Sequence, residues 1–171
     1  KKEIQNIIDK NGTLVTNHDD SNLIDILAKQ PYKNIKSFSI KNNAATVYAK
    51  NISYNQKSTS FELYHNKKLI DKILINTLGT HNIYNALGAI TLSLSLGLSI
   101  NSIKKGLLNF QGVKRRLQLI SKTNDILIYD DYAHHPSEIK TTLNGLKRAY
   151  KSPITCIFQP HRYSRTKDLL E

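Results

Sequence analysis

The sequence predicts an α/β protein in which an antiparallel meander and two helices are followed by a strand–helix–strand unit with parallel strands. Strand-like runs separated by turns rich in asparagine and lysine fill residues 32–78. Apolar residues at helical spacing follow from Asn82 onwards. Strand, helix and strand periods then alternate through residues 126–158, the order of a parallel crossover unit.

Short elements precede the meander. Residues 4–8 have the spacing of a helix that ends before Gly12, and Leu14–Val15 reads as a short strand. Ser21 is a candidate cap for a second short helix. The strand-like runs of the meander include Thr46–Tyr48, Phe61–Tyr64 and Ile73–Ile75.

The helix expected from Asn82 has a single apolar stripe, and Gly97 is placed to end it. The stripe consists of Ile83, Ala86, Leu87, Ile90 and Leu94. A shorter helix is expected at about residues 102–109. We place the domain boundary at the basic run after Gly112, with domains of residues 1–112 and 113–171.

The last part is expected to pair two parallel strands, residues 126–129 and 154–158, around a helix at 137–150. The single cysteine, Cys156, cannot form an internal disulfide. Its apolar neighbours predict a buried strand position, and we assign it no chemistry.

The formal net charge of +12 makes nucleic acid, an anionic membrane and a phosphate-bearing small molecule candidate partners. The lysines are scattered, and neither an aromatic stacking motif nor a charged helical stripe accompanies them. A non-catalytic basic nucleic-acid-binding module is therefore only an alternative of another class. No apolar run is long enough to cross a bilayer, and the first residues lack the pattern of a signal peptide. We expect a cytoplasmic protein that binds neither nucleic acid nor membrane.

Polar side chains gather where the two expected parallel strands end. The first strand leads into Asp130–Pro136 and the second into Gln159–Thr166. Because ligands of open α/β sheets bind beyond the carboxyl ends of the strands, these loops predict a site for an anionic substrate. Each residue also has a structural interpretation, as a helix cap or as a solvated loop residue. A metal site is less favoured, because adjacent histidines rarely face one ion.

A second candidate site lies at the start of the helix near Asn82. Asn82 and Asn85 are three residues apart and share a helical face, and an amide offers the donor and the acceptor that an adenine edge requires. Thr80 or Asn82 is equally suited to cap the helix. From the residues alone the two interpretations stay open.

From about Thr13 to its end, the chain resembles the Mur ligases. Three segments carry the resemblance: G-T-H-N-I-Y-N-A-L from Gly79, G-V-K-R-R from Gly112, and D-D-Y-A-H-H-P from Asp130, continued by F-Q-P-H-R-Y-S-R-T from Phe158. The resemblance implies that residues 1–112 are the late part of an ATP-binding central α/β domain. Residues 113–171 are implied to be the truncated start of a Rossmann-like C-terminal domain. A phosphate loop does not occur in the sequence.

The resemblance implies an ATP-dependent amide ligase of cell-wall synthesis. Such an enzyme joins L-alanine to the lactyl carboxylate of UDP-N-acetylmuramate through an acyl phosphate. A ligase that attaches recycled peptide to the same acceptor is the runner-up. The family's magnesium ligands are expected upstream of these residues, so no metal ligand and no catalytic residue is assigned. The fragment alone is expected to be inactive.

The resemblance also implies two groups of binding residues. The group expected to bind ATP consists of His81, Asn82, Asn85, Arg116 and Asp131. The group expected around the alanine and the reacting carboxylate consists of Tyr132, His134, His161, Arg162 and Arg165.

Overall fold

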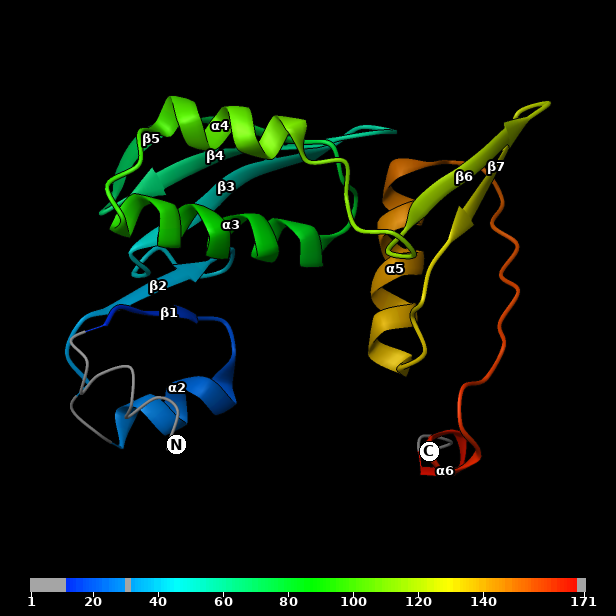
Figure 1. The fold of residues 1–171 in the computed structure, drawn as a ribbon, viewed down its shortest axis with the longest axis horizontal. Coiled ribbons are helices and arrows are strands. Elements are labelled where there is room, and N and C mark those ends of the chain that lie inside the picture. The colour runs from blue at the N-terminus through cyan, green and yellow to red at the C-terminus, as the bar shows by residue number, and fades with distance from the viewer. Residues whose placement is uncertain (1–11, 30–31, 169–171) are drawn as a thin grey trace.

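The computed structural model describes residues 12–29 and 32–168, so the helix expected at residues 4–8 lies outside the described part. The elements run from a mixed sheet through two helices to a hairpin and a further helix (Figure 1). In chain order they are β1 (Leu14–Asn17), α2 (Ser21–Ala28), β2 (Ile35–Ser39), β3 (Val47–Tyr54), β4 (Thr59–His65), β5 (Lys68–Ile75), α3 (Thr80–Ser95), α4 (Ile100–Asn109), β6 (Gln118–Thr123), β7 (Ile126–Asp130), α5 (Pro136–Ala149) and α6 (Tyr163–Asp168).

Five strands form one sheet in the order β1-β2-β3-β4-β5. Strands β3, β4 and β5 are antiparallel, which confirms the predicted meander for this part. Strand β2 differs, because it pairs in parallel with both β1 and β3. Asn66 and Lys67, both with positive φ, turn the chain between β4 and β5. The α/β class is confirmed, with a sheet of mixed rather than purely antiparallel pairing.

Helices α3 and α4 cover one face of this sheet (Figure 1). The predicted apolar stripe of α3 faces the strands, and Leu94 packs at the edge of the core. Alternate residues of the strands point to the same layer, as the pleat requires. The core consists of Val47, Ala49, Phe61, Leu63, Ile73, Ile75, Ile83, Ala86, Leu87, Ile90 and Ile103.

The ends of the helices follow local chemistry. Asp20, not Ser21, caps α2, because its carboxylate accepts the amide of Leu23 at 3.1 Å. Gly97 ends α3 as predicted, with a φ of 80° that suits glycine. Ser99 caps α4, which therefore begins two residues earlier than the spacing suggested.

The second half begins with an antiparallel hairpin of β6 and β7, and β6 was not predicted. Residues 154–158 form no strand, so the predicted parallel pair with β7 is wrong for the described part of the chain. The run is exposed, with Ile157 95% accessible, because none of the described strands pairs with it. Cys156 is exposed too, contrary to the expectation of a buried position.

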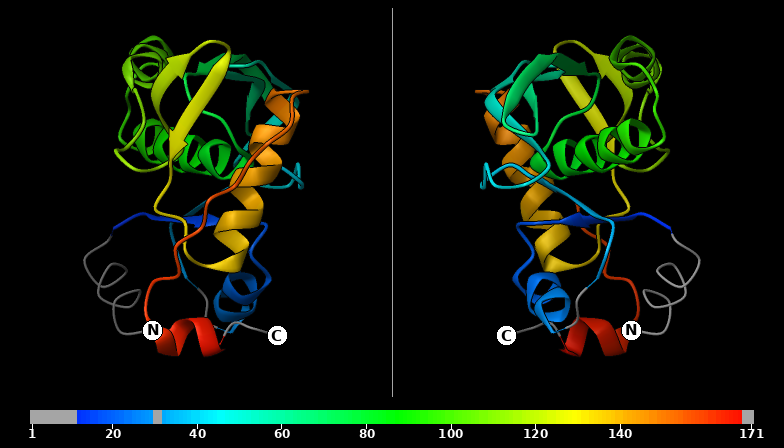
Figure 2. Two further views of the ribbon diagram at one scale, coloured as in Figure 1. Left: turned by 90° about the vertical axis from the view of Figure 1, so that its right-hand side faces the viewer. Right: turned by 90° about the vertical axis from the view of Figure 1, so that its left-hand side faces the viewer.

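Helix α5 packs against the start of α3 and so connects the part after β6 with the five-stranded sheet and its helices (Figure 2). A Cβ at Gly145 would lie 3.1 Å from the Cα of Gly79, so the backbones approach closely there. The Tyr150 hydroxyl donates to the carbonyl of Gln56 at 2.6 Å. Among the described residues, no helix has the length and apolar character needed to cross a membrane.

Candidate nucleotide and substrate site

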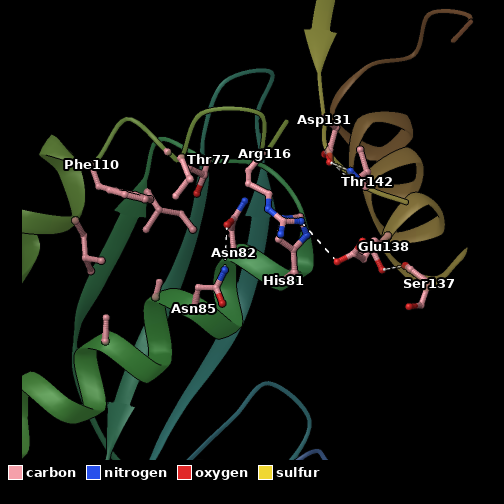
Figure 3. Close-up of a pocket in the computed structure, with 18 of the residues that line it drawn as sticks. Thr77, His81, Asn82, Asn85, Phe110, Arg116, Asp131, Ser137, Glu138 and Thr142 are labelled. Carbon is pink, nitrogen blue, oxygen red and sulfur yellow. Dashed lines mark hydrogen bonds and ion pairs between the residues drawn. The ribbon is translucent and has the colours of Figure 1, made fainter. Parts of the chain in front are cut away.

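A cavity of about 800 Å³ lies where α3, α4, the segment before β6 and the start of α5 meet (Figure 3). Phe110 lies at one end and Asp131 and Glu138 lie at the other (Figure 3). The apolar lining also includes Ile75, Ala86 and Leu107. The polar lining includes all five residues of the predicted ATP group: His81, Asn82, Asn85, Arg116 and Asp131. An apolar pocket with a few convergent polar groups is the usual form of a small-molecule site.

The first turns of α3 supply one polar wall. Neither Thr80 nor Asn82 caps the helix, because the cap residue is Gly79 and no side chain bonds to the free amides. The Asn82 side chain instead donates to the Leu78 carbonyl at 2.7 Å, and Asn85 donates to the Asn82 side-chain oxygen at 3.4 Å. The capping interpretation is therefore wrong, and the amide of Asn85 faces the cavity with hydrogen-bonding capacity to spare.

His81 lies beside these amides and is partly buried. Burial lowers the pKa of His81 below its ordinary value, and the charge of Arg116 lowers it further. The carboxylates of Asp131 and Glu138 oppose this shift without cancelling it. The imidazole is therefore neutral at neutral pH and offers one donor and one acceptor.

Arg116 reaches the cavity from the segment before β6 and faces Glu138 of α5 (Figure 3). The two side chains form an ion pair of 3.6 Å that leaves both partly exposed. Glu138 also accepts the amides of His134 and His135, each at 3.3 Å. Burial alone would raise the pKa of Glu138, but these hydrogen bonds and the charge of Arg116 lower it overall.

Asp131 lies at the end of β7 and organises the loop around it. Its Oδ1 accepts the amide of Ala133 at 2.7 Å. Its Oδ2 accepts the amide of Leu117 and the hydroxyl of Thr142, both at 3.1 Å. Among the described residues Oδ1 accepts one hydrogen bond, and a carboxylate oxygen can accept a second.

Three rings of the predicted substrate group form a cluster outside the cavity wall. The centroid of Tyr132 lies 5.0 Å from that of His134 and 6.1 Å from that of His161. The two histidine rings are 6.0 Å apart. The loops after residues 130 and 158 thus meet at these rings, although the strands expected to bring them together do not pair.

The structure describes the side chain of only one of the two arginines in this group. Arg162 is exposed, with a φ of 70°. Arg165 lies in α6, and its side chain is outside the described part of the structure. Within the described residues, no group of three or more histidine, cysteine, aspartate or glutamate side chains is arranged to hold a metal ion.

Two residues at the site were missed by sequence reasoning, Glu138 and Thr142. A signal existed for Glu138, because it stands three residues after the cap residue His135 and completes a capping box. Thr142 follows one helical turn later and gave no separate signal.

The fold and the cavity define an α/β protein with a pocket of small-molecule size between α3, α4 and α5. Residues 1–93 match the Mur ligase middle domain, and residues 115–171 match the Mur ligase glutamate ligase domain. The chain belongs to the Mur ligase family. The two matches leave residues 94–114 uncovered, and the division at residue 112 stays a prediction.

Two curated relatives carry the name UDP-N-acetylmuramate–L-alanine ligase. The relative from Clostridium acetobutylicum is 43% identical over 97% of this chain and 36% of its own length. The relative from Pelagibacter ubique is 45% identical over 88% of this chain and 34% of its own length. The chain thus spans about a third of the length of the curated relatives it matches.

Solved structures of Mur ligases are also similar to this chain. The UDP-N-acetylmuramate-alanine ligase MurC from Thermotoga maritima superposes with a TM-score of 0.80 at 29% identity, over 98% of this chain and 38% of that protein. MurF from Acinetobacter baumannii gives 0.71 at 28% identity, over 81% and 30%. A murein peptide ligase from Psychrobacter arcticus gives 0.55 at 36% identity, over 80% and 28%.

Proposed function

We propose that the chain is part of an ATP-dependent carboxylate–amine ligase that joins L-alanine to the lactyl carboxylate of UDP-N-acetylmuramate. One observation carries the proposal: the five residues expected to bind ATP line a single cavity, although they come from three separate segments of the chain. Polar residues placed at random along the chain would not all be expected to line the same cavity. The names of the relatives support the choice of substrates.

The chemistry explains why such a site needs both halves. A carboxylate does not react with an amine, because oxide is a poor leaving group. Transfer of the γ-phosphoryl group from ATP to the carboxylate gives an acyl phosphate and ADP, and phosphate then leaves as the amine attacks. The ligase must therefore hold a nucleotide on one side and an amino acid on the other.

In this proposal the nucleotide occupies the cavity. The adenine ring lies against the apolar lining near Leu107 and Phe110, with its polar edge toward the amides of Asn82 and Asn85. Arg116 exchanges its partly exposed ion pair with Glu138 for a phosphate oxygen. Oδ1 of Asp131 accepts a ribose hydroxyl beside the amide of Ala133.

The amino acid lies at the ring cluster. Tyr132, His134 and His161 surround it, and Arg162 and Arg165 are proposed to hold its carboxylate, which guanidinium groups bind with two hydrogen bonds. Magnesium would neutralise phosphate charge during transfer. Among the described residues no group of three or more possible ligand side chains is arranged to hold it. We place the ligase in the cytoplasm.

The test uses the full-length protein to which the chain belongs. Purified protein is mixed with ATP, magnesium, UDP-N-acetylmuramate and either L-alanine or a short peptide that begins with L-alanine. We expect phosphate release that depends on L-alanine, with the alanyl product identified by mass spectrometry. Release with the peptide alone would assign the recycling ligase instead, and release with neither substrate would refute the proposal.

A further inference from the structure

The neighbouring arginines Arg115 and Arg116 point to different places. Arg115 has a φ of 57° and Leu117 a φ of 48°, a left-handed backbone that residues other than glycine rarely adopt. The two unusual residues flank Arg116. The twist sends the Arg116 side chain into the cavity, while Arg115 lies against the loop after β7.

Arg115 makes three contacts with Asp130 and Tyr132 and a fourth with Gln118 of β6. Its Nε lies 3.5 Å from Oδ2 of Asp130, and its guanidinium carbon lies 5.1 Å from the centroid of the Tyr132 ring. Its carbonyl accepts the amide of Tyr132 at 2.8 Å, and its own amide donates to the side chain of Gln118 at 2.9 Å. Backbone and side chain thus hold the same loop.

Tyr132 needs such support, because its side chain is 40% accessible and no core encloses it. The ring meets His134 at 5.0 Å and His161 at 6.1 Å, both edge to face, and it meets Arg115 as well. A cation near an aromatic face attracts the ring. The guanidinium of Arg115 thus contributes to the position of the ring against which the two histidine rings pack.

We propose that Arg115 is a positioning residue for the amino-acid half of the site, while Arg116 serves the nucleotide half. The division into halves rests on the proposed function. The arrangement of the rings does not, because it rests on the contacts among Arg115, Tyr132 and the two histidine rings. The tandem arginines thus divide one basic motif between two subsites.

A purely structural role for Arg115 makes a different prediction. If the left-handed backbone were all that mattered, glycine would serve at this position, because it adopts positive φ without strain. Arg115→Gly keeps the turn and removes the guanidinium, whereas Arg115→Ala removes the guanidinium and keeps the strain. Arg116→Ala is the matched control, since it removes the same group one residue away.

The first arm measures the ring-proton shifts of His161 by NMR on the full-length protein. His161 is the probe because His134 also contacts Glu138, the partner of Arg116. We expect both Arg115→Gly and Arg115→Ala to change the His161 shifts, because the Tyr132 ring current moves, and Arg116→Ala to leave them as in the wild type. Wild-type shifts in Arg115→Gly would overturn the proposal, and so would equal changes in Arg116→Ala.

The second arm measures steady-state kinetics of the full-length protein. Arg115→Ala should raise the Michaelis constant for the amino acid about threefold to thirtyfold, the range that one cation–π contact and one exposed ion pair are worth, with that for ATP nearly unchanged. Arg116→Ala should do the reverse. Equal losses for both substrates in Arg115→Ala contradict the proposal. A wild type without ligase activity contradicts the proposed function, while the NMR arm still tests the ring arrangement.

Discussion

Replacement of Gly79 by alanine tests how the loop before α3 holds the cavity. Gly79 has a φ of 93° and a ψ of 144°, a region that side-chain-bearing residues scarcely occupy. A Cβ at this position would also lie 2.7 Å from Cε1 and 2.9 Å from Nδ1 of His81. The substitution therefore strains the backbone and displaces a ring from the cavity wall.

The two effects differ in size and in kind. Backbone strain costs about 1–3 kcal/mol, and the smaller entropy of the unfolded alanine chain offsets about 0.4–1 kcal/mol of it. A net loss of roughly 1–2 kcal/mol in unfolding free energy is expected. The contact with His81 costs little more, because a ring can turn away, but the turned ring leaves its buried place.

Gly97→Ala is the control. Gly97 has a φ of 80°, and a Cβ there would meet nothing within 4 Å, so the variant carries strain without displacement. Both variants should unfold at lower denaturant concentration. Only Gly79→Ala should raise the pKa of His81 toward its ordinary value, followed by NMR titration, because burial is the main cause of the lowered pKa. An unchanged His81 titration in Gly79→Ala would refute the reasoning.

Three further predictions concern the core, a partly buried carboxylate and the net charge. Leu87→Ala should cost about 2–5 kcal/mol in denaturant unfolding, whereas Leu92→Ala, 47% accessible in the same helix, should stay within about 0.5 kcal/mol; equal losses would contradict the core assignment. Burial would raise the pKa of Asp19, but hydrogen bonds from Ser39, Ile40, Tyr84 and Lys41 lower it overall, so its stabilisation is present above the ordinary pKa of 3.8 and is lost as the pH falls through the lowered value. Asp19→Asn should therefore be less stable than the wild type at pH 7, with a smaller difference well below pH 3.8, and a pH-independent difference would count against this. Binding to duplex DNA should be micromolar or weaker at physiological salt by fluorescence anisotropy, and a sub-micromolar constant would favour the nucleic-acid alternative.

Elements with a clear period could be predicted from the sequence. The stripe of α3 repeats at helical spacing, so its core face is evident before any neighbour is known. The run at residues 154–158 has no such period. A continuous apolar run indicates that a segment is suited to burial, but it does not indicate which strand pairs with it. The structure supplies no pairing strand for it within the described residues.

Strand β6 was missed for another reason. Its apolar and polar residues do not alternate clearly, and four of its six residues are exposed. The turn that follows held the stronger signal, because Asn124 and Asp125 both adopt positive φ and are residue types that tolerate it in two-residue hairpins.

The candidate site was predictable to the extent that its residues stand in recognisable segments. The amides of Asn82 and Asn85 share a face by helical geometry alone. The approach of Arg116 to Glu138 depends on the left-handed backbone before β6 and on the packing of α5. No local sequence pattern predicts either of these two features. Long-range contacts of this kind follow from the fold and not from spacing.

The most direct measurement is a crystal structure of the full-length protein with a non-hydrolysable ATP analogue. We predict that the adenine ring lies in the cavity with its polar edge against Asn82 and Asn85, and that Arg116 has left Glu138 to bind a phosphate oxygen. A nucleotide bound outside this cavity, with the pair of Arg116 and Glu138 intact, would contradict the account.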